Sequence, residues 1–398
     1  LGDAVAGAVN YSAGVVTAAT FTGLSITSTG AASTCAISIS NNDFRGITFT
    51  TSGTGAQTYI INGASTLSQN ISSNTFTNLN VNTTGNVTFI SNSISAGAAG
   101  FKTINNNSIV TAFNKAGAGG TVALYVDGGS STSTTAVQNN NNNFSNITVT
   151  GATTIAGWSN TDGTGSTPPK QITGNTFSNW TGGTSSITAL ASSFGGTSTI
   201  SNNTITNITG QGSITGLSAG SSGTIATLTI ANNSITGLSS TGTGGAVTGI
   251  SNASPATTTN INANTINTFS SSSTTATVVG ITTSASSNIF SNVINALSCV
   301  GTTSGVTNGI MVTGGTTVNV YKNKIYDLST TGAFTTAPGV NGIVLSGTAT
   351  AATRNVYNNL VGDLKAPAST SADAIRGISV TATGTTSTFN VYYNTVYM

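Results

Sequence analysis

The sequence contains no histidine and no glutamate, and its seven acidic residues are all aspartates. Without histidine, neither a Ser–His–Asp triad nor a Cys–His pair can form, and no imidazole is present to bind zinc. The many serine and threonine hydroxyls therefore lack the base that usually activates a nucleophile. These absences exclude the commonest hydrolase chemistry and any histidine-ligated metal site.

Charge is also scarce, since charged residues make up 4% of the 398 residues and leave a net charge of +2. So few charges give neither the basic surface that binds nucleic acid nor a polybasic patch for anionic membranes. No apolar run reaches the roughly 18 residues of a membrane-spanning helix, so no membrane insertion is expected. Disorder is not expected either, because 37% of the residues are hydrophobic.

What the sequence has in abundance is a repeat with a leading asparagine. The motif reads Asn, any residue, apolar, any residue, turn residue, apolar. Its eleven intervals run from 28 to 36 residues and average 32. The motif asparagines are Asn42, Asn74, Asn107, Asn142, Asn175, Asn203, Asn233, Asn264, Asn292, Asn323, Asn359 and Asn394.

Three apolar columns accompany this motif. One lies two residues after the asparagine, as Ile325 does, another lies five residues after it, as Leu328 does, and the third lies three residues before it. Only Asn139 interrupts the third column. A second half-motif, a small residue followed by an apolar one, comes later in most repeats. Its copies are Gly157-Trp158, Ala189-Leu190, Gly216-Leu217, Gly249-Ile250, Gly280-Ile281, Gly309-Ile310, Gly342-Ile343 and Gly377-Ile378.

These patterns predict a stacked β fold. Short apolar–polar alternation between Gly and Asn predicts strands joined by tight turns, because both residues tolerate the left-handed backbone region. A unit of this size cannot bury a core alone, whereas stacked copies bury one continuous column. The sequence thus predicts an all-β, single-stranded parallel β-helix (β-solenoid) of about 12 coils of about 32 residues, with asparagine ladders at its corners. At about 4.8 Å per coil, the rod would be about 58 Å long.

We expect one continuous β-helix over residues 1–398. Residues 1–35 are interpreted as a degenerate first coil, in which residues 17–29 are a degraded copy of the motif with Ala19 in place of the asparagine, and residues 36–398 hold the regular repeats. The sequence starts without an initiator methionine and stops in the middle of a repeat, so we expect both ends to have been cut from a longer chain.

Residues 230–238 (Ile-Ala-Asn-Asn-Ser-Ile-Thr-Gly-Leu) and 200–208 (Ile-Ser-Asn-Asn-Thr-Ile-Thr-Asn-Ile) are typical copies of the repeat. They resemble the right-handed parallel β-helix repeat family, which includes pectate-lyase-like enzymes, phage tailspikes, adhesins and surface filaments. The resemblance covers nearly the whole chain and implies a right-handed coil. Residues 390–397 (Asn-Val-Tyr-Tyr-Asn-Thr-Val-Tyr) also look like repeats of large secreted adhesins of gliding bacteria, which implies a cell-surface location.

Two aspartates are predicted to meet. Asp327 and Asp363 both lie four residues after the motif asparagine and should stack in neighbouring coils about 5 Å apart. Carboxylates at that distance could bind Ca²⁺ or do acid–base work. The same column holds Gly46 and Asn146, so a plain turn is the favoured interpretation. Most other aspartates are taken to be isolated by whole repeats, and no catalytic residue or cofactor is assigned.

An aromatic column is the strongest candidate for ligand contact. Its members, two residues before the motif asparagine in four successive repeats, are Phe290, Tyr321, Tyr357 and Tyr392. The preceding position points inward, so strand alternation should turn these rings outward. With Lys322 and Arg354 beside it, the column is a candidate strip for glycan or partner contact. The favoured interpretation is that the rings support one another or lie under an inserted loop such as residues 330–340.

The remaining unusual residues are expected in the core. Trp158 and Trp180 occupy positions that other repeats fill with Leu or Ile. Cys35 and Cys299 lie about nine repeats apart, which at about 4.8 Å per coil puts them about 43 Å apart, beyond disulfide reach. Each cysteine is therefore interpreted as a small buried residue.

Two functions fit these features. The favoured one is a structural and adhesive segment of a secreted bacterial cell-surface protein or filament, contacting surface glycans, other surface proteins or its own copies, end to end or side by side. The alternative is a polysaccharide lyase or hydrolase on the C-terminal face, which needs Asp327 and Asp363 with Lys365 or Arg376 in one groove. An ice-binding solenoid would need a flat, regular threonine array, and the uneven intervals argue against it.

Overall fold

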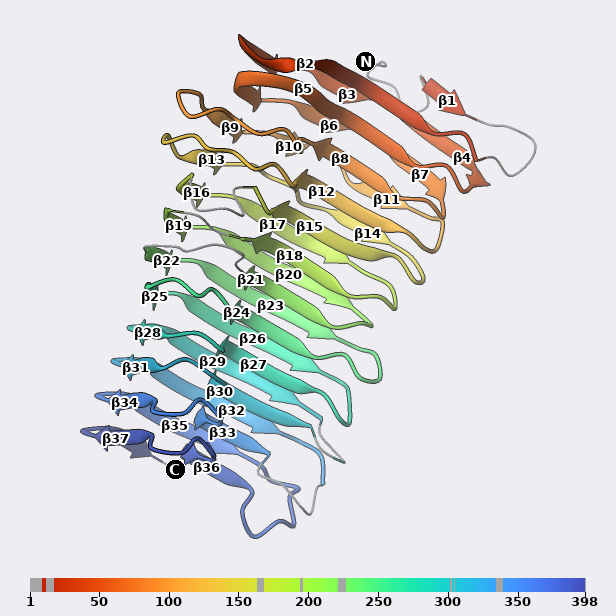
Figure 1. The fold of residues 1–398 in the computed structure, drawn as a ribbon. Coiled ribbons are helices and arrows are strands. Elements are labelled where there is room, and N and C mark those ends of the chain that lie inside the picture. Colours follow the sequence, from red (N-terminus) through yellow and green to blue (C-terminus); the bar gives the residue numbers. More distant parts are fainter. Residues whose placement is uncertain are drawn as a thin grey trace.

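A computed structural model describes residues 9–11, 18–162, 168–193, 196–220, 227–300, 303, 305–333 and 339–397. In these residues the secondary structure consists of strands and turns, without a helix. The strands stack from coil to coil into an elongated solenoid, with β1 and β38 at opposite ends of the stack (Figure 1). It makes about 11 turns of about 32 residues, which are the turns enclosed by the twelve motif asparagines.

The strands form three parallel sheets. Sheet A has 13 strands: β1 (Val9–Tyr11), β4 (Ile47–Gly53), β7 (Asn80–Thr83), β11 (Phe113–Lys115), β14 (Ile147–Val149), β17 (Thr176–Thr181), β20 (Thr204–Gly210), β23 (Ser234–Ser240), β26 (Thr265–Ser271), β29 (Val293–Cys299), β32 (Lys324–Thr330), β35 (Leu360–Lys365) and β38 (Thr395–Tyr397). A short sheet has three: β3 (Asp43–Arg45), β6 (Thr75–Thr77) and β10 (Ser108–Ile109).

Sheet B has 22 strands and supplies two strands to each regular coil. They are β2 (Phe21–Ser40), β5 (Gln57–Ser72), β8 (Val87–Ser91), β9 (Lys102–Asn105), β12 (Thr121–Asp127), β13 (Val137–Asn140), β15 (Thr154–Asn160), β16 (Lys170–Thr173), β18 (Ile187–Ser192), β19 (Thr197–Ser201), β21 (Ile214–Ala219), β22 (Thr227–Ala231), β24 (Val247–Asn252), β25 (Thr258–Asn262), β27 (Thr277–Thr283), β28 (Ser287–Phe290), β30 (Val306–Val312), β31 (Thr317–Tyr321), β33 (Val340–Leu345), β34 (Thr353–Tyr357), β36 (Ile375–Val380) and β37 (Thr388–Tyr392).

The register confirms the predicted apolar columns. In sheet B, Ile200 lies beside Ile230, which lies beside Ile261, and in sheet A the residues two after the motif asparagine align in the same way. These side chains are fully buried and join one continuous hydrophobic core. Alternation along each strand therefore sends one face inward, and coil-on-coil stacking places like residues in contact.

The motif asparagines form the predicted ladder inside the solenoid. The side-chain Nδ2 of each donates to Oδ1 of the motif asparagine in the next coil at 2.9–3.0 Å, from Asn42 through Asn394. The same Oδ1 also accepts the backbone N–H of the preceding asparagine, as Asn233 does from Asn203. Each Nδ2 after the first reaches back to a backbone carbonyl, as Asn233 does to Ile200. The buried amides are thus hydrogen-bonded at both ends, which a buried polar group requires.

A tight corner precedes each motif asparagine. The residue before it has a φ between 53° and 69° in every coil, with Asn at six of these positions and Ala263 and Lys322 among the others. Only a few residue types adopt this left-handed conformation easily, and Asn and Gly are the main ones. The corner turns the chain from sheet B into the strand that follows, which aims the motif asparagine inward.

Two predictions about the N-terminal part are wrong. Cys35 is exposed, whereas Cys299 is buried as predicted, and the two do not form a disulfide. Residues 17–29 do not copy the asparagine motif, because Leu24 pairs with Ile60, which pairs with Ile90 in the row of the half-motif. The dipeptide Gly23-Leu24 is therefore a copy of the small–apolar half-motif. Residues 1–8 and 12–17 of the predicted first coil lie outside the described residues.

Both tryptophans are buried, as predicted. Trp158 explains the interruption of the third column, because its indole Nε1 donates to Oδ1 of Asn139 at 3.0 Å. Asn160 donates to the same oxygen at 2.8 Å. The Nε1 of Trp180 instead donates to the backbone carbonyl of Phe144. In this coil Trp158 and Asn139 replace two aliphatic residues of other coils, and the Asn139 amide accepts the indole N–H.

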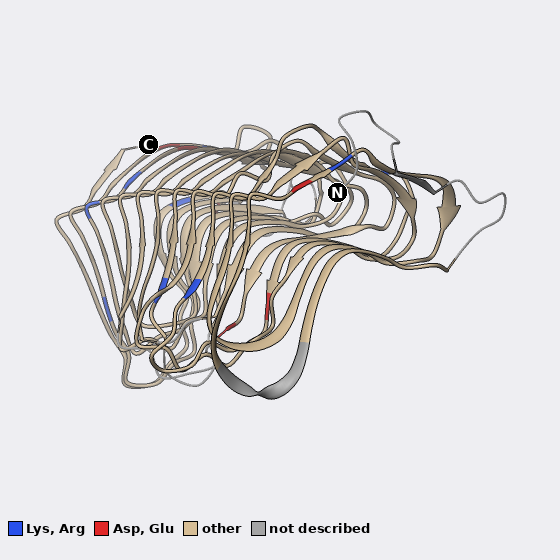
Figure 2. Cartoon of the chain, turned by 90° about the horizontal axis from the view of Figure 1, so that it is seen from above, with Lys and Arg blue, Asp and Glu red and all other residues tan. Residues whose placement is uncertain are grey.

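Figure 2 shows the solenoid from above, with few Lys, Arg and Asp residues among the uncharged ones. Several of them are buried, including Lys102, Lys115, Asp127, Asp162 and Lys170. None of the described segments forms a helix that is long and apolar enough to cross a membrane.

Candidate ligand-binding groove

The aromatic column is a continuous stack of rings. Successive centroids from Phe290 to Tyr392 lie 5.0, 5.0 and 5.2 Å apart, and successive ring planes are tilted by 7° or less. Phe290, Tyr321 and Tyr357 are half-buried, and Tyr392 is 43% exposed. Burial and the two neighbouring hydroxyls raise the pKa of Tyr357. Because the faces of the inner rings cover each other, a ligand along the column would meet ring edges and hydroxyls.

A second asparagine ladder, which was not predicted from the sequence, runs beside these rings on the outer surface. Side-chain amides join its neighbours at 2.7–3.0 Å. Each member lies two residues before an aromatic or equivalent position, so it faces the same side, and that spacing could have revealed it. The members are Asn260, Asn288, Asn319, Asn355 and Asn390.

The prediction that Arg354 lies on the outer strip is wrong. Lys322 is exposed at a corner, as contact with a ligand on that strip requires. Arg354 is 1% exposed and faces the interior because it lies two residues before the inward Val356. Its Nη2 lies 3.5 Å from the carbonyl of Gly314, and its Cζ lies 5.7 Å from the ring centroid of Phe389. Burial lowers the pKa of this guanidinium. Strand alternation alone would have predicted the inward direction.

Asp327 and Asp363 lie opposite each other in neighbouring coils, as predicted, at turn positions with φ of 55° and 51°. Lys365 lies between them, with its Nζ 3.1 Å from Asp327 and 2.9 Å from Asp363. These hydrogen bonds raise the pKa of Lys365. In the described part of the chain no three Cys or Asp side chains come together as a metal site would need. The favoured turn interpretation accounts for the pair, and the lysine supplies its counter-charge.

A groove lies on another face of the solenoid, across β24, β27, β30, β33 and β36, which we name the glycine row. Each of these strands carries the half-motif glycine. A Cβ on Gly309 would lie 2.6 Å from the side chain of Ile325 and from the carbonyl of Gly342. The glycine thus lets the strand approach sheet A closely, and the residues on either side of the Gly-Ile pair, Asn308 and Met311, face outward.

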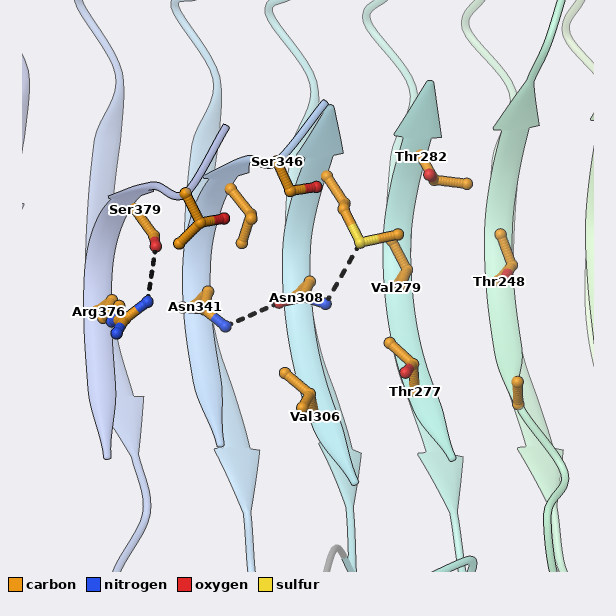
Figure 3. Close-up of a pocket in the computed structure, with 14 residues that line it drawn as sticks. Thr248, Thr277, Val279, Thr282, Val306, Asn308, Asn341, Ser346, Arg376 and Ser379 are labelled. Carbon is orange, nitrogen blue, oxygen red and sulfur yellow. Dashed lines mark hydrogen bonds between the residues drawn. The ribbon is translucent and has the colours of Figure 1, made fainter. Parts of the chain in front are cut away.

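A groove of about 500 Å³ follows this row along the axis of the solenoid (Figure 3). Its floor includes the apolar side chains of Val279, Val306, Met311 and Val344. The polar side chains that line it are Thr248, Thr277, Thr282, Asn308, Asn341, Ser346, Arg376, Ser379 and Thr381. No acidic side chain is among its described lining residues.

The polar groups of the groove form a row across three strands (Figure 3). Asn341 donates to Asn308 at 2.9 Å, and Asn308 lies 3.8 Å from the sulfur of Met311. Arg376 donates to Ser379 at 3.1 Å and pairs with Asp373. The hydrogen bonds to Asp373 raise the pKa of the Arg376 guanidinium. Oδ1 of Asn341 is buried without a hydrogen-bond donor among the described residues. The groove therefore combines an apolar floor with amide, hydroxyl and guanidinium groups.

Two aspartates that were predicted to be isolated are brought together inside the solenoid. Lys102 contacts both Asp127 and Asp162, and all three side chains are fully buried. Lys102 lies two residues before the inward Ile104, so alternation could have predicted its direction. Its partners could not have been predicted, because Lys102 and Asp162 are 60 residues apart.

Comparison with known proteins gives no further assignment. No family model, no curated protein and no solved structure matches this chain.

Proposed function

We propose that this chain is a structural and adhesive segment of a secreted bacterial cell-surface protein, and that its groove holds an extended glycan. The observation that carries the proposal is the groove along the glycine row, which crosses five neighbouring strands of the solenoid. A trough of this shape suits a linear polymer lying along the rod. The internal asparagine ladder supports the structural part, because it ties successive coils together by hydrogen bonds.

The lining favours a glycan over a charged polymer. Sugar rings present apolar C–H faces and a rim of hydroxyls, and the groove offers Val279 and Val344 on its floor with amide and hydroxyl groups around them. Binding sites of this kind pair an apolar surface with a few oriented polar groups. Arg376, the one cationic residue among the described residues that line the groove, already has Asp373 as its partner, so this lining does not favour a polyanion.

We expect a groove-filling substitution to weaken glycan binding. Thr282 lines the groove at a half-exposed position, and Thr282→Arg would place a long charged side chain across the floor. The expected loss in affinity is about tenfold or more, or about 1.4 kcal/mol. Affinity electrophoresis against a panel of neutral and acidic polysaccharides measures it.

Ser218→Arg is the matched control, because Ser218 lies in the same register column two coils away and outside the groove. It should bind as the wild type does. Equal loss in both variants, or no retardation of the wild type by any polysaccharide, would contradict the groove as the glycan site.

The cell-surface location is tested on intact cells of the source organism. Brief protease treatment should release peptides of this chain, and mass spectrometry of the intact product should give a polypeptide much longer than 398 residues. A soluble secreted product of about this length would instead contradict the surface-segment proposal.

The enzyme alternative needs Asp327 and Asp363 in an open groove with a basic residue. The two aspartates lie on β32 and β35 of sheet A, whereas the groove follows sheet B. Of the residues that the enzyme alternative needs, only Arg376 lines the groove. We expect the wild type to release no reducing ends from polysaccharides, and Asp327→Asn with Asp363→Asn to leave glycan binding unchanged. Cleavage that the double variant abolishes would establish the enzyme instead.

A further inference from the structure

The buried cluster around Lys102 has no role in the groove or the asparagine ladder. Lys102 begins β9, Asp127 ends β12, and Asp162 follows β15, so the cluster joins successive coils. Burying charges is costly, and an ion pair repays the loss of hydration only in part. The cluster lies beside the apolar core, with Lys115 and Lys170 also buried in neighbouring coils, so the buried charges call for a separate explanation.

The lysine nitrogen faces the carboxyl group of Asp127 directly. Nζ of Lys102 lies 2.9 Å from Oδ1 and 2.8 Å from Oδ2 of Asp127, and 3.0 Å from Oδ2 of Asp162. Contact with both oxygens of one carboxyl places the nitrogen near the carbon between them. Such fixed proximity is what converts a slow bimolecular reaction into a fast intramolecular one.

Each carboxyl has a different set of hydrogen bonds. Oδ1 of Asp127 accepts the backbone N–H of Gly129 at 3.1 Å, and its Oδ2 accepts the hydroxyl of Tyr125 at 2.6 Å. Each donor can stabilise negative charge on the oxygen that it contacts. Asp162 is held by Ser131, whose backbone N–H and hydroxyl donate to its two oxygens at 2.8 and 2.6 Å.

The surroundings also shift the pKa values of the two carboxyl groups in opposite directions. Burial raises the pKa of Asp127, which favours its neutral form. Burial also acts to raise the pKa of Asp162, but Lys102 and the hydrogen bonds from Ser131 outweigh it and leave that pKa lowered. A pair of carboxyls divided in this way can act as electrophile and base.

We propose that Lys102 and Asp127 condense into an intramolecular isopeptide bond, with Asp162 as the proton carrier. The Lys102 ammonium first gives a proton to Asp127, which leaves a neutral amine and a neutral carboxylic acid. Nζ then attacks Cγ of Asp127, Asp162 takes a proton from the nitrogen and returns it to the departing hydroxyl, and one water leaves. The net change is an ammonium and a carboxylate converted to one amide and one water.

The bond would close a loop of 25 residues and tie β9 covalently to β12. It would replace three buried charges by one, which the hydrogen bonds from Ser131 already stabilise. A cross-link in the solenoid wall would also resist forced separation of these coils, which suits a segment that carries load between a cell and a surface.

The test is the mass of the folded full-length chain, whose β structure is checked by circular dichroism. The wild type should be lighter than its sequence mass by about 18 Da, one water. Trypsin should fail to cleave after Lys102, and peptide 46–115 should be recovered joined to peptide 116–170. Fragmentation should place the link on Asp127 and leave Asp162 intact.

Three variants make the test specific. Lys102→Arg keeps the positive charge but removes the amine and should show the full sequence mass. Asp162→Asn keeps Lys102 and Asp127 but removes the base, and should slow the mass loss at least tenfold. Lys115→Arg changes another buried lysine, whose contacts are carbonyl and hydroxyl oxygens, and should keep the loss. A folded wild type with unchanged mass and normal cleavage after Lys102 would leave only a buried ion cluster and overturn the proposal.

Discussion

Replacing Asn233 by Ala in the internal ladder should lower the free energy of unfolding by about 2–6 kcal/mol. The side chain of Asn233 makes four hydrogen bonds, to both amide groups of Asn203, to the carbonyl of Ile200 and to Asn264. Its removal leaves the backbone N–H of Asn203 and the carbonyl of Ile200 buried without these partners. Each buried polar group without a partner costs about 1–3 kcal/mol. Chemical unfolding followed by circular dichroism measures the loss.

Asn232→Gly is the control for this experiment. Asn232 is adjacent in sequence, exposed, and has a φ of 56°, a conformation that glycine adopts without strain. We expect its effect on stability to be within about 0.5 kcal/mol. If Asn233→Ala were as mild as the control, the ladder would hold the solenoid together far less than its geometry indicates.

The second large effect concerns the pair Trp158 and Asn139. Trp158→Leu removes a fully buried indole and should cost about 3 kcal/mol or more. Asn139→Ile should cost about 2 kcal/mol or more, because it leaves both the indole Nε1 and the side-chain amide of Asn160 without this acceptor. The double variant has Leu and Ile at these two positions, as the next coil does with Leu190 and Ile172. We therefore expect the double variant to be more stable than the sum of the single costs by at least about 1 kcal/mol.

Trp180 provides the matched cycle. Its Nε1 donates to the backbone carbonyl of Phe144, which substitution of Asn139 does not remove. Trp180→Leu and Asn139→Ile should therefore add to within about 0.5 kcal/mol. Equal coupling energies in both cycles would show that general packing, and not the indole–amide bond, joins Trp158 to Asn139.

The spacing of the asparagines was enough to predict the coils, the inward columns and the ladder. A coil places each residue against the residue one period away, so a repeated Ile or Asn has its own copy as its neighbour. The register of Ile200, Ile230 and Ile261 follows from that rule alone. Alternation within a strand would also have placed Arg354 and Lys102 inside, had it been applied to charged residues as strictly as to apolar ones.

The candidate sites were predicted less well, because they depend on geometry within a coil. The aromatic column has the predicted position, but the orientation of each ring is set by the ring below it. The groove is lined by side chains from five strands that carry Gly309 and its equivalents, so no single position in the sequence reveals it. The intervals of 28 to 36 residues also leave open which strands of one coil face those of the next.

The sequence by itself therefore determined the contacts along the axis of this protein, because these join equivalent residues of successive repeats. The tertiary structure alone decided the contacts across the coil. The meeting of Lys102 with Asp127 and Asp162 depends on where each turn bends the chain. A period fixes the neighbour above and below each residue, but the cross-section of the coil fixes the neighbour opposite.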